Sequence, residues 1–334
     1  MNTTFIACVK GKKILYCVLN WGLGHASRSI PLIKQLGIDN DITIASDGEA
    51  SHLLKQELPD ISFHELPSYG IHYKYSSMHL NMLLQFPKIA SAYRSEHKKI
   101  KELVDREGFD LIISDNRYGC YHETVKSIFL GHQLKILGSP VATRVNKYQI
   151  SKFDECWIPD DKDRRLSGDL SDPEGLDNCK LIGPLSRMKN LVREIKYDLA
   201  IILSGPEPKR TELEFKIINQ LRELNVRSCL VRGTKKAGTI NQNINNAKIE
   251  VKDFLDSPAL NEIIASSRMV ICRSGYSSLM DLEVVEKPAL IIPTKGQKEQ
   301  EYLANHYTQK DFITTQKSDQ LDLASAIAAL NMLK

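Results

Sequence analysis

Short apolar runs alternate with longer amphipathic segments along nearly the whole chain of 334 residues. The apolar runs, such as KILYCVL at 13–19 and DLAIILS at 198–204, are typical of buried strands, and the segments between them are typical of helices. This alternation of strand and helix predicts an α/β protein whose parallel sheets are covered by helices on both faces.

The expected elements follow from these runs. Strands are predicted at 13–19, 41–45, 61–66, 110–114, 128–130, 154–158, 198–204, 226–231, 247–251, 269–272 and 288–293. Helices are predicted at 25–36, 48–57, 78–106, 117–126, 209–224, 257–267, 276–286, 298–310 and 319–332.

The pattern starts afresh at Asp198, and a chain of this length is too long for one ordinary core. We therefore expect an N-terminal domain over 1–184, a linker over 185–197 that contains a charged run, and a C-terminal domain over 198–334. Each half opens with a strand that ends in a glycine-bearing loop, and this predicts two Rossmann-like domains that face each other across a cleft.

Composition limits the class of protein. Hydrophobic residues make up 42% and charged residues 26%, and no apolar stretch approaches the ~20 residues of a membrane span. None of the seven cysteines lies in a CxxC or CxxH spacing, which favours reduced thiols in the cytoplasm and no zinc site. The net charge of +4 weakly favours an anionic partner, but no basic stripe with interleaved aromatic residues predicts binding to nucleic acid.

The most specific motif is RSGYSSLMD, directly after the strand that ends at Cys272. Free backbone N–H groups at the start of the following helix suit an anion such as a phosphate, and Gly275 lets a ligand approach the backbone. Hydroxyls and a cation are available from Ser274, Ser277, Ser278 and Arg273. Asp281, one turn further on, could accept hydrogen bonds from both hydroxyls of a ribose. The alternative is an ordinary helix start without a ligand.

The loop TKGQKEQ at 294–300 follows the next strand. Consecutive strands of a doubly wound sheet end at the same crevice, so this loop and the RSG loop can face one ligand. Gln297, Gln300 and Glu301 would then contact sugar hydroxyls, unless they belong to an exposed helix start.

The third motif is NWGLGHASRS at 20–29. A dinucleotide-binding fingerprint would have a third glycine at Ser27 and an acid such as Asp47 after the second strand. The alternative is a catalytic loop in which His25, at a helix N-terminus that disfavours imidazolium, acts as a general base. A third interpretation limits His25 to a hydrogen bond with the loop or with a product phosphate.

Two of these motifs together resemble glycosyltransferase family 28, which includes the MurG-type transferases and has the GT-B fold. RSGYSSLMDLEVVEKPALIIPTKGQKEQEYLAN resembles its donor-binding signature, and GLGHASRSIPLIKQL resembles its N-terminal loop. The resemblance implies that the C-terminal domain holds a UDP-sugar and the N-terminal domain an acceptor. Asp281 takes the place of the ribose-binding glutamate of the family, and Gly205 lies in the second glycine loop. Gln300 matches a sugar-contacting glutamine, whereas Glu301 replaces another one.

In this interpretation Gly22 and Gly24 open space for the acceptor and His25 faces it. Asp115 ends a predicted strand of the same sheet and would orient His25 or, with Asn116, bind acceptor hydroxyls. A helix N-cap is the alternative role for Asp115. His122 and His132 are each more typical of structural histidines.

No DxD triplet directly follows a strand and no HExxH motif or cluster of histidines and acids occurs, so we expect a metal-independent enzyme with no cofactor besides the nucleotide sugar. Helix N-termini and Arg273 would balance the charge of the leaving diphosphate. Direct displacement by an acceptor hydroxyl implies inversion at the anomeric carbon.

The segment 78–101 combines apolar residues with flanking lysines and arginines. This pattern suits peripheral contact with an anionic membrane, which would be the inner face for a cytoplasmic enzyme with a lipid-linked acceptor. A core-facing helix with a solvated basic side is the alternative.

The leading hypothesis is an inverting transferase that moves a sugar from a UDP-sugar such as UDP-GlcNAc to a hydroxyl acceptor, such as a lipid-linked or cell-envelope glycan precursor. PseG-type nucleotide-sugar hydrolases share a GxGHxxR loop and form the main alternative. A nonhydrolysing 2-epimerase and an inactive sugar-nucleotide sensor are weaker ones.

Overall fold

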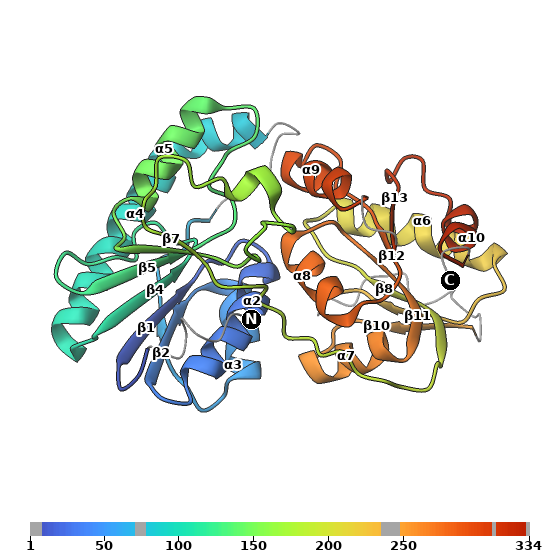
Figure 1. Ribbon diagram of the computed structural model, residues 1–334, viewed down its shortest axis with the longest axis horizontal. Helices are drawn as coiled ribbons and strands as arrows, with labels where there is room; N and C mark the ends of the chain where they lie inside the picture. Colours follow the sequence, from blue (N-terminus) through green and yellow to red (C-terminus); the bar gives the residue numbers. More distant parts are fainter. Residues whose placement is uncertain (1–8, 71–77, 235–247, 309–311, 332–334) are drawn as a thin grey trace. The chain divides into compact units, whose positions relative to one another are not determined.

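The computed structural model describes residues 9–70, 78–234, 248–308 and 312–331, and for 78–84, 86 and 331 it describes the backbone alone. The chain divides into two compact units, Met1–Leu185 and Ser186–Lys334. Each unit is built around its own parallel sheet (Figure 1).

The N-terminal unit contains a seven-stranded parallel sheet in the order β3-β2-β1-β4-β5-β6-β7. Its strands are β1 (Lys13–Val18), β2 (Asp41–Ser46), β3 (Ser62–Glu65), β4 (Leu111–Asp115), β5 (Lys126–Leu130), β6 (Glu155–Ile158) and β7 (Cys179–Leu181). Its helices are α2 (Leu23–Leu36), α3 (Gly48–Glu57), α4 (Met78–Glu107), α5 (Pro140–Ile150) and the short 3₁₀ helix η1 (Gly168–Ser171).

Side chains of a strand alternate between the two faces of the sheet, and both faces of this sheet are buried. Leu15 of β1 packs with Ile100 and Leu103 of α4 in one apolar cluster. Tyr16, which points to the opposite face, is also fully buried. The continuous apolar run at 13–18 is therefore explained by helices on both sides of the central strand.

The C-terminal unit contains a six-stranded parallel sheet in the order β10-β9-β8-β11-β12-β13. Its strands are β8 (Tyr197–Ile202), β9 (Ser228–Val231), β10 (Ile249–Lys252), β11 (Ser267–Cys272), β12 (Ala289–Ile291) and β13 (Ile313–Thr315). Its helices are α6 (Lys209–Glu223), α7 (Ser257–Ala265), α8 (Tyr276–Val285), α9 (Lys298–Tyr307) and α10 (Leu323–Asn331).

In each sheet the order of the strands reverses at one point. Strand order reverses between β1 and β4 in the first unit and between β8 and β11 in the second. In doubly wound sheets the crevice outside the carboxyl ends of these two strands is where ligands bind. A ligand is therefore expected at the loops after β1, β4, β8 and β11. Most of the predicted site residues lie in these loops or just after them.

The segment predicted as a linker, 185–197, packs mostly on the C-terminal unit. The backbone N–H of Lys189 donates to Asn261 across 3.0 Å, and Nε of Arg193 donates to Glu262 across 2.8 Å. Lys196 bonds through its backbone to Ser266. These contacts fix most of the segment against α7 and its C-terminal end.

The predicted helix at 117–126 is wrong, because residues 116–125 form an irregular loop between β4 and β5. Asn116 takes a left-handed conformation with φ of 60°, and Arg117 turns its side chain into the interior. The backbone N–H of Gly119 donates to Glu96 of α4 across 2.8 Å. Tertiary contacts thus replace helical hydrogen bonds here. The sequence did not predict helix α5 or strands β7 and β13. The two strands are short, and α5 lacks a strong apolar run.

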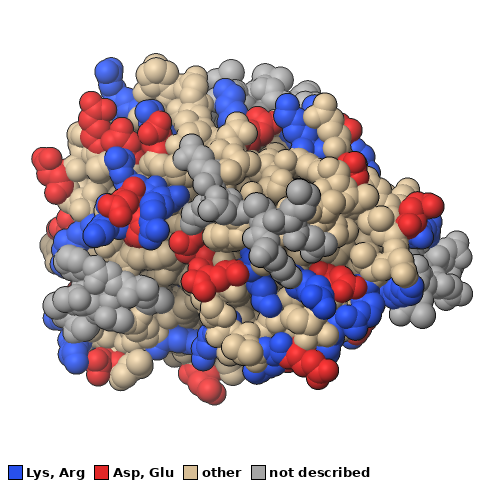
Figure 2. Space-filling model, turned by 45° about the vertical axis from the view of Figure 1, so that its right-hand side comes forward, with Lys and Arg blue, Asp and Glu red and all other residues tan. Residues whose placement is uncertain are grey.

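Within the described part of the chain, no helix is both long and apolar enough to cross a membrane. The apolar side chains of the predicted membrane-contact segment, at 78–84 and 86, lie outside the described residues. On the face shown in Figure 2, basic and acidic side chains are intermixed.

Candidate functional site

His25 and Asp115 form a hydrogen-bonded pair at the reversal point of the N-terminal sheet. His25 lies in the first turn of α2, and Asp115 is the last residue of β4. Nδ1 of His25 lies 2.8 Å from Oδ1 of Asp115. The side chain of Asp115 is fully buried, whereas that of His25 keeps 14% of its surface exposed. The structure therefore brings together the two predicted catalytic residues, and Asp115 is not a helix N-cap.

Arg28 and Ser29 fix the carboxylate of Asp115 from the side of α2. Nε of Arg28 donates to Oδ2 across 2.8 Å, and its Nη2 donates to Oδ1. The hydroxyl of Ser29 donates to Oδ2 across 2.8 Å. Nη1 of Arg28 also donates to Nδ1 of His132 across 2.9 Å. A buried carboxylate with this many donors is held in one orientation.

These contacts bear on the position of the proton on the neutral imidazole. Burial alone would raise the pKa of Asp115, but the charge of Arg28 and the contact with His25 hold it well below its usual range. The ionised carboxylate can only accept, so its contact of 2.8 Å favours the tautomer with the proton on Nδ1 of His25 and the lone pair on Nε2, whereas Nη2 of Arg28, which lies 3.0 Å from the same Nδ1, favours the opposite tautomer. Burial, followed by the nearby charge of Arg28, lowers the pKa of His25 below its ordinary value. A neutral His25 with a basic Nε2 suits proton abstraction.

Asp47, the acid that a dinucleotide site would need, is paired with an arginine inside the protein. Oδ1 of Asp47 accepts a hydrogen bond from Nη1 of the buried Arg117 across 2.7 Å. Nε of Arg117 donates to Glu96, which is also fully buried. Because Asp47 belongs to this internal ion pair, the structure argues against the dinucleotide interpretation of the loop.

The predicted acceptor-binding residues surround the catalytic pair in the chain. Gly22 precedes α2 with φ of 75°, which is a conformation that glycine adopts without strain. A Cβ atom at Gly22 would meet no atom within 4 Å, so the conformation rather than a close approach requires glycine. Gly24 lies in the first turn of α2, and Asn116, half-buried, directly follows Asp115. Their contact with an acceptor stays a prediction.

In the C-terminal unit the RSG loop and the start of α9 are joined directly. The hydroxyl of Ser274, after β11, donates to the backbone carbonyl of Gln300 across 2.8 Å. Gly275 is the N-cap of α8, and as a glycine it brings no capping side chain to the first turn. Ser277 and Ser278 lie half-buried in the first turn. The RSG loop and the start of α9 therefore lie side by side in this unit, and a shared ligand stays a prediction.

Gly205, after β8, completes the group of loops with φ of 102°. The nearest neighbour of a Cβ atom there would be Oγ1 of Thr294, at 3.9 Å. Oγ1 of Thr294 is itself buried with no hydrogen-bond partner among the described residues. The loops after β8, β11 and β12 thus come together at one edge of the sheet, where an unpartnered hydroxyl is left.

Asp281 lies on α8 in a half-buried position. Its Oδ1 accepts a hydrogen bond from the hydroxyl of Ser186 across 2.5 Å. Burial raises the pKa of Asp281 to about 6, although the charge of Arg187 and the hydroxyl of Ser186 oppose this shift. A carboxyl group held near its point of titration is costly for a fold and is typical of functional sites.

The guanidinium group of Arg273 forms its hydrogen bonds within the protein. Nη2 of Arg273 donates to the carbonyl of Lys209 across 2.9 Å, and Nη1 lies 3.3 Å from that of Pro293. Burial lowers the pKa of Arg273 to about 10, and its Nε has no partner among the described residues. Arg273 therefore ties its loop to the start of α6 and to the segment after β12, and its contact with a diphosphate stays a prediction.

The side chains of Gln297, Gln300 and Glu301 form hydrogen bonds within the loop at 294–300 and the start of α9. Oε1 of Gln300 accepts from the backbone N–H of Thr294 across 2.9 Å, and its Nε2 donates to Gln297 across 2.6 Å. Oε1 of Glu301 accepts from the backbone N–H of Gly296 across 2.8 Å. Contact of these three side chains with a sugar stays a prediction.

The sequence did not identify Arg28, Ser29, His132 and Ser186 as parts of a site. Arg28 and Ser29 follow His25 at helical spacing, and that spacing was the available signal. His132 and Ser186 are distant in sequence from their partners, so no local pattern could have found them. Among the described residues, no group of three or more His, Cys, Asp and Glu side chains could hold a metal ion.

Comparison with known families agrees with this geometry. Residues 205–332 match the model of the glycosyltransferase family 28 C-terminal domain, and residues 12–137 match a model of glycosyl transferase family 1. The two models cover the loops that carry Asp281 and His25. No curated protein sequence matches the chain.

Solved structures with the same fold share little sequence with this chain. The kitacinnamycin glycotransferase has a TM-score of 0.68 at 11% identity, over 96% of this chain and 90% of its own. LpCGTa in complex with UDP has a TM-score of 0.65 at 11% identity, with the same coverage. MurG of Acinetobacter baumannii has a TM-score of 0.59 at 11% identity, again over 96% and 90%. These likenesses show the GT-B fold.

Proposed function

This chain is a glycosyltransferase of the GT-B type, with a family 28 domain in its C-terminal half, and we propose that it transfers a sugar from a UDP-sugar to a hydroxyl acceptor with inversion. The observation that carries the proposal is the contact of 2.8 Å between His25 and Asp115, with Nε2 of His25 left as a base. UDP is the nucleotide bound by LpCGTa, which has the same fold, and this supports a uridine donor.

The donor is held by the C-terminal unit in this proposal. The N-terminus of α8, where Gly275 is the N-cap, offers backbone N–H groups and the positive end of the helix dipole to the diphosphate. Asp281 accepts hydrogen bonds from the ribose hydroxyls. The helix terminus thereby balances the charge that develops on the leaving UDP, and no metal ion is needed for that step.

The acceptor is held by the N-terminal unit. Nε2 of His25 takes the proton of the acceptor hydroxyl as its oxygen attacks the anomeric carbon. The bond from that carbon to the diphosphate oxygen breaks, and UDP leaves with the electron pair. Asp115 and Arg28 keep the imidazole oriented while the proton is transferred. One displacement inverts the anomeric configuration.

A hydrolase is the second candidate, because Arg28 of the GxGHxxR loop contacts both members of the pair. The same base could activate a water molecule in place of an acceptor hydroxyl. UDP-sugar turnover in the absence of acceptor, at a rate that added glycan acceptors do not raise, would assign this activity instead.

The base assignment is tested with His25→Ala. We expect turnover to fall by about 10²–10⁴-fold, which is the usual contribution of a general base, with an unchanged Kd for UDP measured by calorimetry. Asp281→Ala should weaken UDP binding instead. Unchanged turnover in His25→Ala would refute the base, and the absence of binding to UDP, GDP and dTDP sugars would refute the function.

The acceptor and the place of the enzyme in the cell are the remaining questions. We propose a glycan or lipid-linked acceptor and an enzyme of the cytoplasm that contacts the inner face of the membrane through 78–101. Flotation of the protein with vesicles containing anionic lipid tests the contact, and absence from the floated fraction would refute it.

A further inference from the structure

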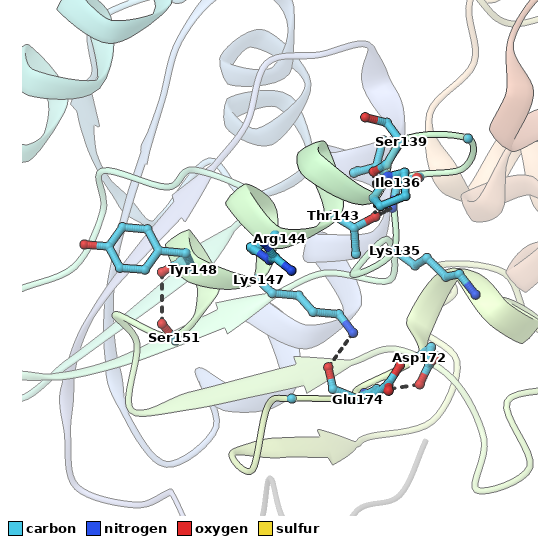
Figure 3. A pocket seen from close by; sticks show the side chains of 13 residues that line it. Lys135, Ile136, Ser139, Thr143, Arg144, Lys147, Tyr148, Ser151, Asp172 and Glu174 are labelled. Atoms are coloured by element: carbon cyan, nitrogen blue, oxygen red, sulfur yellow. Dashed lines mark hydrogen bonds between the residues drawn. The ribbon is translucent and has the colours of Figure 1, made fainter.

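A cavity of about 710 Å³ lies in the N-terminal unit beside α5 (Figure 3). It is lined by α5, by the loop that connects β5 to α5, and by the segment around 172–175. Its volume falls within the range of sites for small ligands, about 300–1,000 Å³. We refer to it as the α5 groove.

Cations without partners border the α5 groove. The side chains of Lys135 and Arg144 make no hydrogen bond or ion pair within the described part of the chain, and Arg144 is exposed. Figure 3 shows Lys147 extended from α5 toward Glu174, whose backbone carbonyl it bonds. Asp172 already has a cationic neighbour, Arg164, at 3.8 Å. The lining therefore holds three cations, Lys135, Arg144 and Lys147, and two carboxylates, Asp172 and Glu174, which leaves an excess of one positive charge.

An aromatic side chain lies at the other end of the groove. Tyr148 is 63% exposed and lines the cavity. An exposed tyrosine offers an apolar face beside a polar hydroxyl, and such a surface packs well on a ring that carries hydroxyls. Cations and an aromatic face in one groove suit a ligand with both an anionic group and a ring.

The groove is joined to the catalytic pair by a short stretch of chain. His132, which accepts a hydrogen bond from Arg28, lies in the same loop as Lys135. Two residues lie between them, so their Cα atoms are at most about 11 Å apart. Arg28 in turn holds Asp115. Lys135, at the border of the groove, is therefore close along the chain to a residue that contacts the partner of Asp115 and His25.

We propose that the α5 groove binds a phosphate group of a phosphorylated saccharide acceptor, through Lys135, Arg144 and Lys147. The proposal rests on the transferase function given above and names the chemical class of its acceptor. Guanidinium and ammonium groups are the side chains that bind phosphate most strongly. A concave groove fits a single chain, whereas the exposed Val141 and Val145 on the neighbouring face of α5 make a lipid surface the competing occupant.

The test uses the full chain saturated with UDP, so that the donor site is filled, and inorganic diphosphate as the probe. Backbone amide resonances are followed by NMR during titration. We expect shifts at Lys135 and along α5, and an affinity about a hundredfold weaker in the double variant Lys135→Ala/Arg144→Ala, because each of the two lost charged hydrogen bonds costs about tenfold. Lys162→Ala, which removes an exposed cation of the same unit outside the groove, should bind diphosphate as the unaltered protein does.

The outcomes separate this proposal from the proposed function. Shifts absent from the α5 groove, or equal affinity in the double variant, would overturn it while UDP binding stays intact. Flotation with phosphatidylcholine–phosphatidylglycerol vesicles that is lost in the double variant, without diphosphate binding in the groove, would overturn it in favour of a membrane surface. Loss of UDP binding by the unaltered protein would instead refute the donor site.

Discussion

The hydroxyl of Ser186 donates to the carboxyl group of Asp281 across 2.5 Å, at the position assigned to ribose binding. Ser186 is itself fixed, because its Oγ accepts the backbone N–H of Met188 across 3.0 Å. Asp281 is thereby oriented before any nucleotide arrives. The same contact opposes the rise in its pKa that burial causes. Ser186 is a positioning residue for the proposed donor site.

Replacement of Asp281 by asparagine should raise the stability of the protein and lower its affinity for UDP. The pKa of Asp281 is raised to about 6 in the folded protein, so the folded state binds its proton more tightly than the unfolded chain. The destabilising contribution of the ionised group therefore grows as pH rises from about 4 to 6 and is complete above that. We expect Asp281→Asn to raise the free energy of unfolding by about 1–2 kcal/mol at pH 8 and to lose UDP affinity.

Denaturant unfolding at two pH values checks the stability, and calorimetry checks UDP binding. The gain in stability should vanish below about pH 3, where the carboxyl group is protonated in both the folded and the unfolded state. A variant that is less stable at pH 8 would contradict the assignment of a strained carboxylate.

Replacement of Ser186 by alanine should move the pH dependence of UDP binding. The hydroxyl favours the ionised carboxylate, so its loss raises the pKa of Asp281 further. UDP affinity, which needs the ionised form as an acceptor, should then begin to fall at a higher pH. Calorimetric titrations between pH 5 and 8 measure this shift, and Ser186→Thr, which keeps a hydroxyl, is the matched control. Equal pH profiles for all three proteins would argue against the positioning role.

Replacement of Arg28 by glutamine should raise the pKa of His25. Burial and the positive charge of Arg28 both lower that pKa, and the variant removes the charge while Asp115 stays ionised. The imidazolium is then better stabilised, so the acidic limb of the rate profile moves to higher pH. NMR titration of the His25 ring protons, assigned with His25→Ala, measures the change without reference to activity.

Arg28→Lys is the control for the loss of packing, because it keeps a positive charge near the pair. A buried carboxylate that loses its partner is costly, so both variants should be less stable, but only the glutamine variant should shift the titration of His25 strongly. An unchanged pKa in Arg28→Gln would show that Arg28 does not tune the base.

Replacement of Asp115 by asparagine should lower turnover without loss of UDP affinity. The amide can donate to Nδ1 of His25 and so place the proton on Nε2, which removes the lone pair from the acceptor side. In enzymes with such a pair, the wrong tautomer lowers kcat by about 10⁴-fold. Steady-state kinetics with saturating donor measure the effect. Turnover within a few-fold of the unaltered protein would show that Asp115 does not set the tautomer.

The sequence predicted the elements of both sheets well where apolar runs are continuous. Strands near 13–18, 41–46, 198–202 and 267–272 were expected from such runs, because a strand buried on both faces has no polar side to obscure it. The short edge strands β7 and β13 have only three residues each and gave no comparable pattern. The helix at 117–126 was predicted wrongly, because Arg117 and Gly119 bond to Glu96 of α4 rather than within a helix.

The sequence by itself determined the two loops that carry chemistry, since glycines, hydroxyls and a histidine directly after buried strands are local features. Only the tertiary structure decided how their side chains are used. Asp115 meets His25 from 90 residues away, and Ser186 meets Asp281 from 95. Strand order and burial, which no local pattern encodes, place these partners together and set their pKa values. Other long-range contacts place Asp47 in an ion pair with the buried Arg117, and Asp115 lies beside His25 at the end of the glycine loop.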